Sequence, residues 1–83
     1  MFYSYILKSK LNGAYYVGSC HDLEKRVDLH NHGMAKSTKR YAPWSLVYYE
    51  TFEDLKDARQ REKQIKLWKK RERIESLIKH FKN

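Results

Sequence analysis

A single carboxylate stands where an apolar side chain is expected. On a helix, Glu62 lies on the same stripe as Leu55, seven residues before it, and Ile65, three residues after it. A carboxylate that points at a core is destabilising unless a cation pairs with it. The partner is either an Arg or Lys side chain, with Arg26 the candidate for an internal ion pair, or a metal ion. The first alternative is structural, whereas the second gives the fold a divalent-cation site.

Two more polar side chains are spaced to act together. Arg26 and His30 are i, i+4 neighbours on a predicted helix, beside its apolar positions Leu23 and Val27. The planar fork of N–H donors on an arginine can hold two oxygens of a phosphate. His30, one turn later, can assist at the same phosphate or relay a proton. A zinc pair of His30 and His32 is disfavoured, because no Cys or further His lies at zinc spacing.

A hairpin rich in tyrosine precedes that helix. Residues 2–8 and 14–20 are predicted strands, because both are rich in aromatic and branched side chains. Asn12-Gly13 lies between them and is a strong hairpin signal, since both residues tolerate the positive φ of a two-residue type I′ turn. With that turn, the opposed pairs are Leu11–Ala14, Ser9–Tyr16, Leu7–Gly18 and Tyr5–Cys20.

The alternation of side chains along a strand predicts which residues share a face of this hairpin. Tyr3, Tyr5, Tyr16 and Gly18 lie on one face. Because Gly18 has no side chain, it leaves a hollow between the tyrosines. A tyrosine can take a proton from water only if its pKa falls from about 10, and a nearby cation favours this by stabilising the phenolate.

Capping residues and hydrophobic patterns predict the middle of the chain. Asp22 as N-cap and Gly33 after the last turn delimit a helix over residues 23–32. Residues 33–43 are a predicted basic loop. Residues 44–52 are a third strand that is apolar on both faces near its middle, so it is predicted at the centre of the sheet.

Two helices are predicted after the third strand. Asp54 is placed to cap the first of them, with Asp57 three residues later in a capping-box-like position. The C-terminal apolar stripe points roughly opposite to the stripe that contains Glu62, so one straight helix cannot bury both. The helix is therefore predicted to break near residues 68–71. The two stripes are Leu55, Ala58, Ile65 and Trp68, and Ile74, Leu77, Ile78 and Phe81.

Composition and charge limit the function classes. The 83 residues have room for one small domain, residues 1–83. Eighteen Lys and Arg against ten Asp and Glu give a net charge of +8, which favours a polyanionic partner, most often nucleic acid. The lone Cys20 excludes an intramolecular disulfide and fits a reducing, cytoplasmic compartment. No apolar run approaches the roughly 20 residues that span a bilayer, so no membrane partner is expected.

Two basic stretches are candidates for contact with phosphates. The run near the predicted helix break is either a track along a nucleic-acid backbone or a solvated helix end, and the track is preferred. The candidate residues are Lys69, Lys70, Arg71 and Arg73 in this run, and Lys39 and Arg40 in the predicted basic loop.

Four elements occur in a family-specific order: Tyr3-Ser4-Tyr5, Tyr16-Val17-Gly18, Arg26 and Glu62. Nearly the whole chain thereby resembles the GIY-YIG nuclease domain, and it is most similar to short stand-alone bacterial members and to the N-terminal nuclease domain of an excision-repair nuclease. Its most similar stretches are YYVGSCHDLEKRVDLHN, LVYYE and ARQREKQIKLWKK. The resemblance implies an α/β (α+β) fold, a three-stranded antiparallel sheet flanked by about three helices. It also implies cleavage of DNA phosphodiesters with Mg²⁺ or Mn²⁺.

The resemblance also implies roles for individual residues. Tyr5 and Tyr16 match the two motif tyrosines, and Gly18 matches the motif glycine. Arg26 matches the helix arginine, which would hold the scissile phosphate. Glu62 matches the glutamate that binds the metal, and one carboxylate suffices for Mg²⁺ when waters and phosphate oxygens complete its coordination. The tyrosines are rival general bases; Tyr5 is preferred, and Tyr16 then orients the water or hydrogen-bonds the phosphate.

The chain departs from the family pattern at three places. Its first motif reads Tyr-Ser-Tyr instead of Gly-Ile-Tyr, but it keeps the tyrosine. Ser19 stands where many relatives have a cationic or polar catalytic helper, and the neighbouring His21 can substitute for it. Ile74 stands where some relatives have a supporting Asn. The last two departures bear on the rate of turnover.

The expected substrate is branched, nicked, flapped or otherwise damaged DNA, in repair or recombination. Little surface remains for reading base edges, so structure-selective cleavage is favoured over sequence-specific cleavage. A larger partner protein would supply further specificity. The alternatives are a non-catalytic nucleic-acid-binding module that keeps the nuclease fold, and an interaction protein whose basic helices bind an acidic protein.

Overall fold

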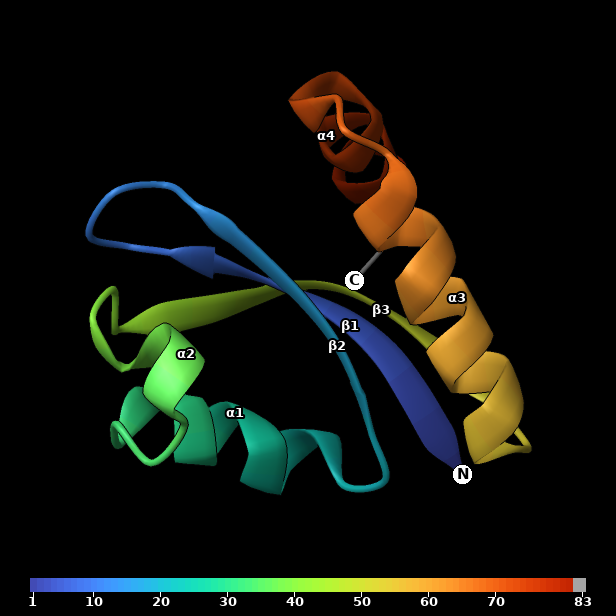
Figure 1. Cartoon of the computed structure of the whole chain (residues 1–83), viewed down its shortest axis with the longest axis horizontal. Helices are drawn as coiled ribbons and strands as arrows, with labels where there is room; N and C mark the ends of the chain where they lie inside the picture. The colour runs from blue at the N-terminus through green and yellow to red at the C-terminus, as the bar shows by residue number, and fades with distance from the viewer. Residues whose placement is uncertain (82–83) are drawn as a thin grey trace.

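A three-stranded antiparallel sheet with helices on both faces forms the fold (Figure 1). The computed structural model describes residues 1–81, and its strands lie in the order β2-β1-β3. The α+β class and the antiparallel three-stranded sheet are confirmed. The elements are β1 (Phe2–Ser9), β2 (Tyr15–Cys20), α1 (Leu23–Asn31), α2 (Lys36–Lys39), β3 (Trp44–Phe52), α3 (Leu55–Leu67) and α4 (Arg71–Lys79).

The central strand is β1, so the prediction that residues 44–52 lie at the centre is wrong. All four residues of 4–7 are at most 1% exposed, because elements cover both faces of β1. The pairing of β1 with β3 is irregular between Ile6 and Leu7. Tyr48 and Leu46 oppose consecutive residues of β1, so Val47 is an extra residue. Leu46 and Tyr49 lie on the α1 side of the sheet, whereas Val47 and Tyr48 pack on the α3 side, so both faces of β3 are apolar although it is an edge strand.

The hairpin between β1 and β2 closes through a four-residue loop, and the predicted two-residue type I′ turn is wrong. The Ser9 N–H donates to the Ala14 carbonyl at 2.8 Å, and the Gly13 N–H donates to the Ser9 carbonyl at 2.9 Å. Only Gly13 takes a positive φ here, 76°, whereas Asn12 does not. The Ser9 hydroxyl oxygen accepts the N–H groups of Leu11 and Asn12 at 3.1 and 3.2 Å. This local capping of the loop by Ser9 favours the longer connection.

The longer loop shifts the register by two residues but does not change the faces. Tyr5 opposes Gly18 and Leu7 opposes Tyr16, where the sequence had predicted Cys20 and Gly18. Because side chains alternate with a period of two, a shift of two leaves each side chain on its predicted face. The shared face of Tyr3, Tyr5, Tyr16 and Gly18 is therefore confirmed.

Each face of the sheet has its own apolar cluster. Helices α1 and α2 lie on one side of the sheet, and α3 and α4 lie on the other (Figure 1). The cluster on the α1 side contains Tyr5, Leu7, Cys20 and Trp44, with Leu23 and Val27 of α1 packed against it. The cluster on the α3 side contains Ile6, Val17 and Ile65, with Ile74, Leu77 and Ile78 of α4 packed against it.

Helix α1 begins and ends as predicted, but residues 33–43 are not entirely a loop. The Asp22 carboxylate accepts the Lys25 N–H at 3.1 Å, and Gly33 has a φ of 71°. The one-turn helix α2 follows, and Thr38, one of its four residues, is fully buried. The Trp44 indole N–H donates to the Thr38 carbonyl at 2.8 Å, which fastens this turn to the start of β3.

The predicted break between the last two helices is confirmed at residues 68–70, which lie between α3 and α4. Asp54 occupies the N-cap position of α3, but its side chain makes no capping hydrogen bond. The break turns the stripe of α4 back onto the sheet, where its apolar residues extend the cluster around Ile65.

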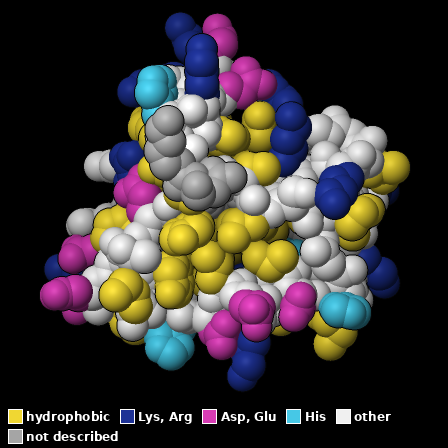
Figure 2. Space-filling view, turned by 180° about the vertical axis from the view of Figure 1, so that it is seen from behind, with side chains coloured by type: hydrophobic (Ala, Val, Ile, Leu, Met, Phe, Trp, Pro, Cys, Tyr) yellow, Lys and Arg dark blue, Asp and Glu magenta, His cyan; other side chains and the backbone are white. Residues whose placement is uncertain are grey.

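Part of the sheet face on the α1 side is not covered by a helix. Leu46 and Tyr49 of β3 are 37% and 38% exposed, which is large for apolar side chains on a sheet. Figure 2 shows hydrophobic side chains gathered at the centre of the molecule as seen from behind, with acidic side chains along their lower margin.

Candidate functional site

The ring of Tyr5 lies directly over Gly18. A Cβ atom added to Gly18 would come within 2.5 Å of the Tyr5 hydroxyl oxygen and 2.6 Å of its Cζ. These distances are far shorter than van der Waals contact, so the absence of a side chain at Gly18 is what admits Tyr5. The hollow predicted between the tyrosines is filled by the tyrosine ring itself.

The Gly18→Ala substitution is expected to lower the free energy of unfolding by about 3 kcal/mol, the upper end of the usual cost of overpacking a core. Urea denaturation measures this. In a Tyr5→Leu background the same substitution is expected to cost at least about 1 kcal/mol less, because the clashing atoms are gone. An equal cost in both backgrounds would show that Gly18 serves another purpose.

A buried chain of hydrogen bonds connects Tyr5 to α1 and α2. The Tyr5 hydroxyl lies 3.1 Å from His30 Nε2, and His30 Nδ1 lies 2.6 Å from Thr38 Oγ1. The Thr38 hydroxyl donates to the Ala35 carbonyl at 3.4 Å, so it accepts from Nδ1–H of the imidazole. His30 Nε2 is then the acceptor, and the Tyr5 hydroxyl donates to it. Thr38 thus fixes the neutral tautomer of His30.

Burial determines the protonation of this pair. Burial raises the pKa of the Tyr5 phenol well above its ordinary value, and Tyr16 raises it further, whereas the Arg26 guanidinium acts in the opposite direction. Burial, followed by the nearby Arg26 cation, lowers the pKa of His30. Both groups are therefore neutral near pH 7, with the proton on Tyr5 directed at His30.

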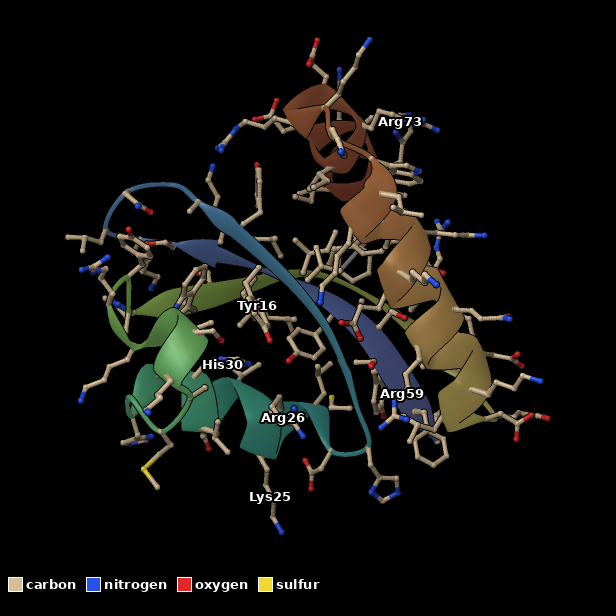
Figure 3. All side chains as sticks on the ribbon, in the orientation of Figure 1. Tyr16, Lys25, Arg26, His30, Arg59 and Arg73 are labelled. Carbon is tan, nitrogen blue, oxygen red and sulfur yellow. The ribbon has the colours of Figure 1, made fainter. Side chains whose placement is uncertain are left out.

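Tyr16 and Arg26 face each other across the same space. Figure 3 shows Tyr16 directed from β2 toward α1 and Arg26 directed from α1 toward the sheet, whereas Lys25 points away from it. The Tyr16 ring lies 4.9 Å from the His30 ring, and Tyr16 is partly exposed while Arg26 is exposed. The structure therefore brings Tyr5, Tyr16, Arg26 and His30 together, with Arg26 and Tyr16 at the solvent side.

Glu62 belongs to the opposite face of the sheet. The Ser19 hydroxyl donates to Glu62 Oε1 at 2.6 Å, and Ser4, which pairs with Ser19, donates to the Ala58 carbonyl of α3. The other oxygen, Oε2, pairs with Lys66 Nζ at 2.5 Å. The alternative of an internal Arg26–Glu62 ion pair is therefore wrong for the described part of the chain, since Lys66 supplies the cation.

The surroundings of Glu62 fit a divalent cation that needs a single protein carboxylate. Its side chain is 20% exposed, and its position at the open edge of β2 leaves room for water ligands. The carboxylate already pairs with a cation, the half-exposed ammonium of Lys66. Residues 1–81 contain no group of three or more His, Cys, Asp or Glu side chains that could hold a metal ion without further ligands.

An open depression on α3 surrounds Glu62 with basic side chains that the sequence interpretation missed. Arg59, Lys63 and Lys66 line it together with Glu62. The signal was present for Arg59 and Lys66, because positions i−3 and i+4 lie beside Glu62 on a helix. Thr38 was missed as well, and no local pattern marks it.

Residues 1–75 match the GIY-YIG catalytic domain. The chain belongs to the GIY-YIG family. It is 40% identical over 76 residues to a UPF0213 protein of Staphylococcus saprophyticus, which covers 90% of this chain and 92% of that protein. It is 41% identical over 78 residues to a UPF0213 protein of Clostridium perfringens, with coverage of 93% and 83%.

A solved structure has the same GIY-YIG fold. The solution NMR structure of a UPF0213 protein from Bacillus halodurans is 32% identical in sequence and superposes with a TM-score of 0.59. The superposition covers 95% of this chain and 84% of that one. Sequence and structure therefore agree on membership of the GIY-YIG family.

Two positions at which this GIY-YIG chain departs from the family pattern, Ser19 and Ile74, make structural contacts. Ser19 holds the Glu62 carboxylate through its hydroxyl. Ile74 packs against the apolar cluster on the α3 side. His21 is exposed, and its ring lies 5.2 Å from Phe2.

The basic candidates fall into two groups. Lys69 and Lys70 are exposed in the break between α3 and α4, and Lys39 and Arg40 are exposed around the end of α2. Arg71 instead donates to the Gly13 carbonyl at 2.8 Å and stacks over the Tyr15 ring at 4.4 Å, so it fastens α4 to the hairpin. Arg73 stacks over the Trp68 ring at 4.6 Å.

None of the helices within residues 1–81 is long and apolar enough to cross a membrane.

Proposed function

We propose that this protein is a divalent-metal-dependent endonuclease that hydrolyses DNA phosphodiesters. The observation that carries the proposal is the convergence of Tyr5, Tyr16, Arg26 and His30 in one space between the sheet and α1. Phosphodiester hydrolysis needs an activated water, a cation at the phosphate and a route for a proton, and this set can provide them. Family membership supports the same activity.

Tyr16, rather than Tyr5, is the better candidate to receive the proton of the attacking water. Tyr5 is 1% exposed, its pKa is raised and its proton is already donated to His30. Tyr16 is partly exposed, so water and a phosphate can reach its hydroxyl. The rings of Tyr5 and His30 pack against Tyr16 and would position its side chain. Arg26 would bind the scissile phosphate through the N–H donors of its guanidinium.

Glu62 would hold the metal ion, Mg²⁺ or Mn²⁺. When bound, such an ion lowers the pKa of a water ligand and neutralises charge on the phosphate. Ser19 orients the carboxylate through its hydroxyl. Because β2 is an edge strand, a DNA backbone that crosses this edge can contact Arg26 on one side of β2 and Glu62 on the other. Arg59, Lys63, Lys69 and Lys70 are the basic groups available for neighbouring phosphates.

Residues 1–83 would form one catalytic domain that acts on branched, nicked or flapped DNA in repair or recombination. The domain is small, so it offers little surface for reading bases, and a larger partner protein would supply target choice. The buried thiol of Cys20, whose pKa burial raises, fits a reducing cytoplasm because it is not poised to react.

The second candidate function is a nucleic-acid-binding module without turnover. Two observations favour it: Lys66 pairs with the carboxylate that a metal ion would need, and position 19 holds a serine in place of a cationic helper. Such a module would bind DNA with a steep dependence on salt and without regard to Mg²⁺.

Cleavage of labelled duplex, single-stranded, flap and four-way-junction DNA tests the proposal. We expect cutting with Mg²⁺ or Mn²⁺ and none in EDTA, with a preference for flap or junction DNA. Activity that persists in EDTA would contradict the metal dependence. Salt-sensitive binding without any cutting under all metal conditions would support the non-catalytic module instead.

A further inference from the structure

The uncovered sheet face beside α1 is a groove with an apolar floor. The groove has a volume of about 710 Å³ and lies between α1 and β3, so we call it the α1–β3 groove. Its floor consists of Tyr3, Leu46 and Tyr49 from the sheet and Leu23 and Val27 from α1. An exposed apolar surface of this kind on a small protein marks a place where another molecule binds.

The rim of this groove is acidic, in contrast to the chain as a whole. Asp22, Glu24 and Asp28 lie along it, and none of the described lining residues is Lys or Arg. The chain carries a net charge of +8, so this concentration of carboxylates around an apolar floor is a local reversal of sign. Such a rim repels phosphates and therefore does not suit the DNA backbone.

A second copy of the chain fits the groove poorly. In a two-fold symmetric contact the same patch occurs on both protomers, so two acidic rims would face each other. Like charges across an interface destabilise the complex. Charge complementarity instead points to a partner with Lys or Arg side chains around apolar ones.

We propose that the α1–β3 groove docks a segment of another protein in which apolar side chains are flanked by Lys or Arg. The apolar side chains of the partner would pack against Tyr3, Leu46 and Tyr49. Its Lys or Arg side chains would pair with the carboxylates of Glu24 and Asp28 on α1. Helix α1 carries Arg26 and His30 of the proposed active site at neighbouring positions. Glu24 and Asp28 are each two residues from Arg26, roughly 200° around the helix, so a protein held in this groove binds the opposite flank of the helix that carries Arg26.

Selection of random 12-residue peptides displayed on phage tests this proposal with full-length protein as the target. Enriched peptides are expected to combine at least two Lys or Arg with aromatic or aliphatic residues. Synthetic copies are expected to bind the Leu46→Ser/Tyr49→Ser protein at least about tenfold more weakly, and the Glu24→Lys/Asp28→Lys protein likewise. Leu67→Ser, at an apolar residue that is 65% exposed on α3, is the matched control and should bind as the wild type does.

Circular dichroism and thermal unfolding of each variant check that it is folded. Three results would overturn the proposal: no enrichment over the Leu46→Ser/Tyr49→Ser protein, enriched peptides that are acidic or uncharged, or equal binding to the groove variants. A wild-type dimer in sedimentation that the Leu46→Ser/Tyr49→Ser protein does not form would overturn it too, because the groove would then bind a second copy.

Discussion

DNA cleavage by the Glu62→Gln protein is expected to be roughly 1,000-fold slower than cleavage by the wild type in Mg²⁺. The amide is nearly the same size and can still accept from Ser19, but it lacks the charge that a divalent cation needs. A bound metal contributes several kcal/mol to transition-state stabilisation, and each 1.36 kcal/mol corresponds to a tenfold change in rate. Single-turnover cleavage of a flap or junction substrate measures the effect.

The Glu72→Gln protein is the matched control, because Glu72 is an exposed glutamate on α4 and outside the site. It should cleave as the wild type does. Thermal unfolding of both variants separates a loss of chemistry from a loss of fold, since Glu62 also pairs with Lys66 on the surface of α3. Wild-type rates in a folded Glu62→Gln protein would remove Glu62 from the role of metal ligand.

Local signals predicted most element boundaries of this fold. The side-chain cap of Asp22 and the positive φ of Gly33 delimit α1 within one turn, and these are interactions among residues close in sequence. The opposed directions of two helical stripes predicted the break at residues 68–70, because a straight helix fixes the angle between them. Such signals do not depend on the rest of the molecule.

The errors arose where distant residues decide the structure. The loop after β1 is set by the Ser9 hydroxyl, which also donates to the Tyr41 carbonyl, so a remote residue helps to select a four-residue loop over a type I′ turn. The order of the strands depends on which strand both layers of helices cover. Apolar residues on a bulged edge strand look, in sequence, like those of a central strand.

The candidate site was predictable where the spacing of residues along a strand or helix decides which side chains lie together. Alternation along two paired strands places Tyr5 and Tyr16 on one face in either register, and i, i+4 spacing places Arg26 beside His30. Nothing local indicated that Glu62 meets Ser19 and Lys66 on the other side of β2, or that Thr38 selects the tautomer of His30. Those contacts depend on how α2 and α3 pack against the sheet.

Replacement of Arg26 by Ala is expected to reduce kcat/KM for DNA cleavage by about 100- to 1,000-fold, the usual effect of removing one donor that stabilises charge in a transition state. The guanidinium is the cation beside Tyr5 and His30, and it faces Tyr16 from α1 (Figure 3). Its loss removes the guanidinium that would hold the scissile phosphate. Because Arg26 is exposed, the variant should unfold at nearly the wild-type temperature.

Lys25→Ala is the matched control for this variant, because the adjacent lysine has the same charge, lies on the same helix and points away from the sheet (Figure 3). It should cleave within about threefold of the wild type, since a surface charge of this kind contributes little. The two variants lose the same net charge, so a general weakening of DNA attraction would affect both equally. Equal losses would therefore reduce Arg26 to a nonspecific contact, whereas a selective loss in Arg26→Ala would assign it to the scissile phosphate.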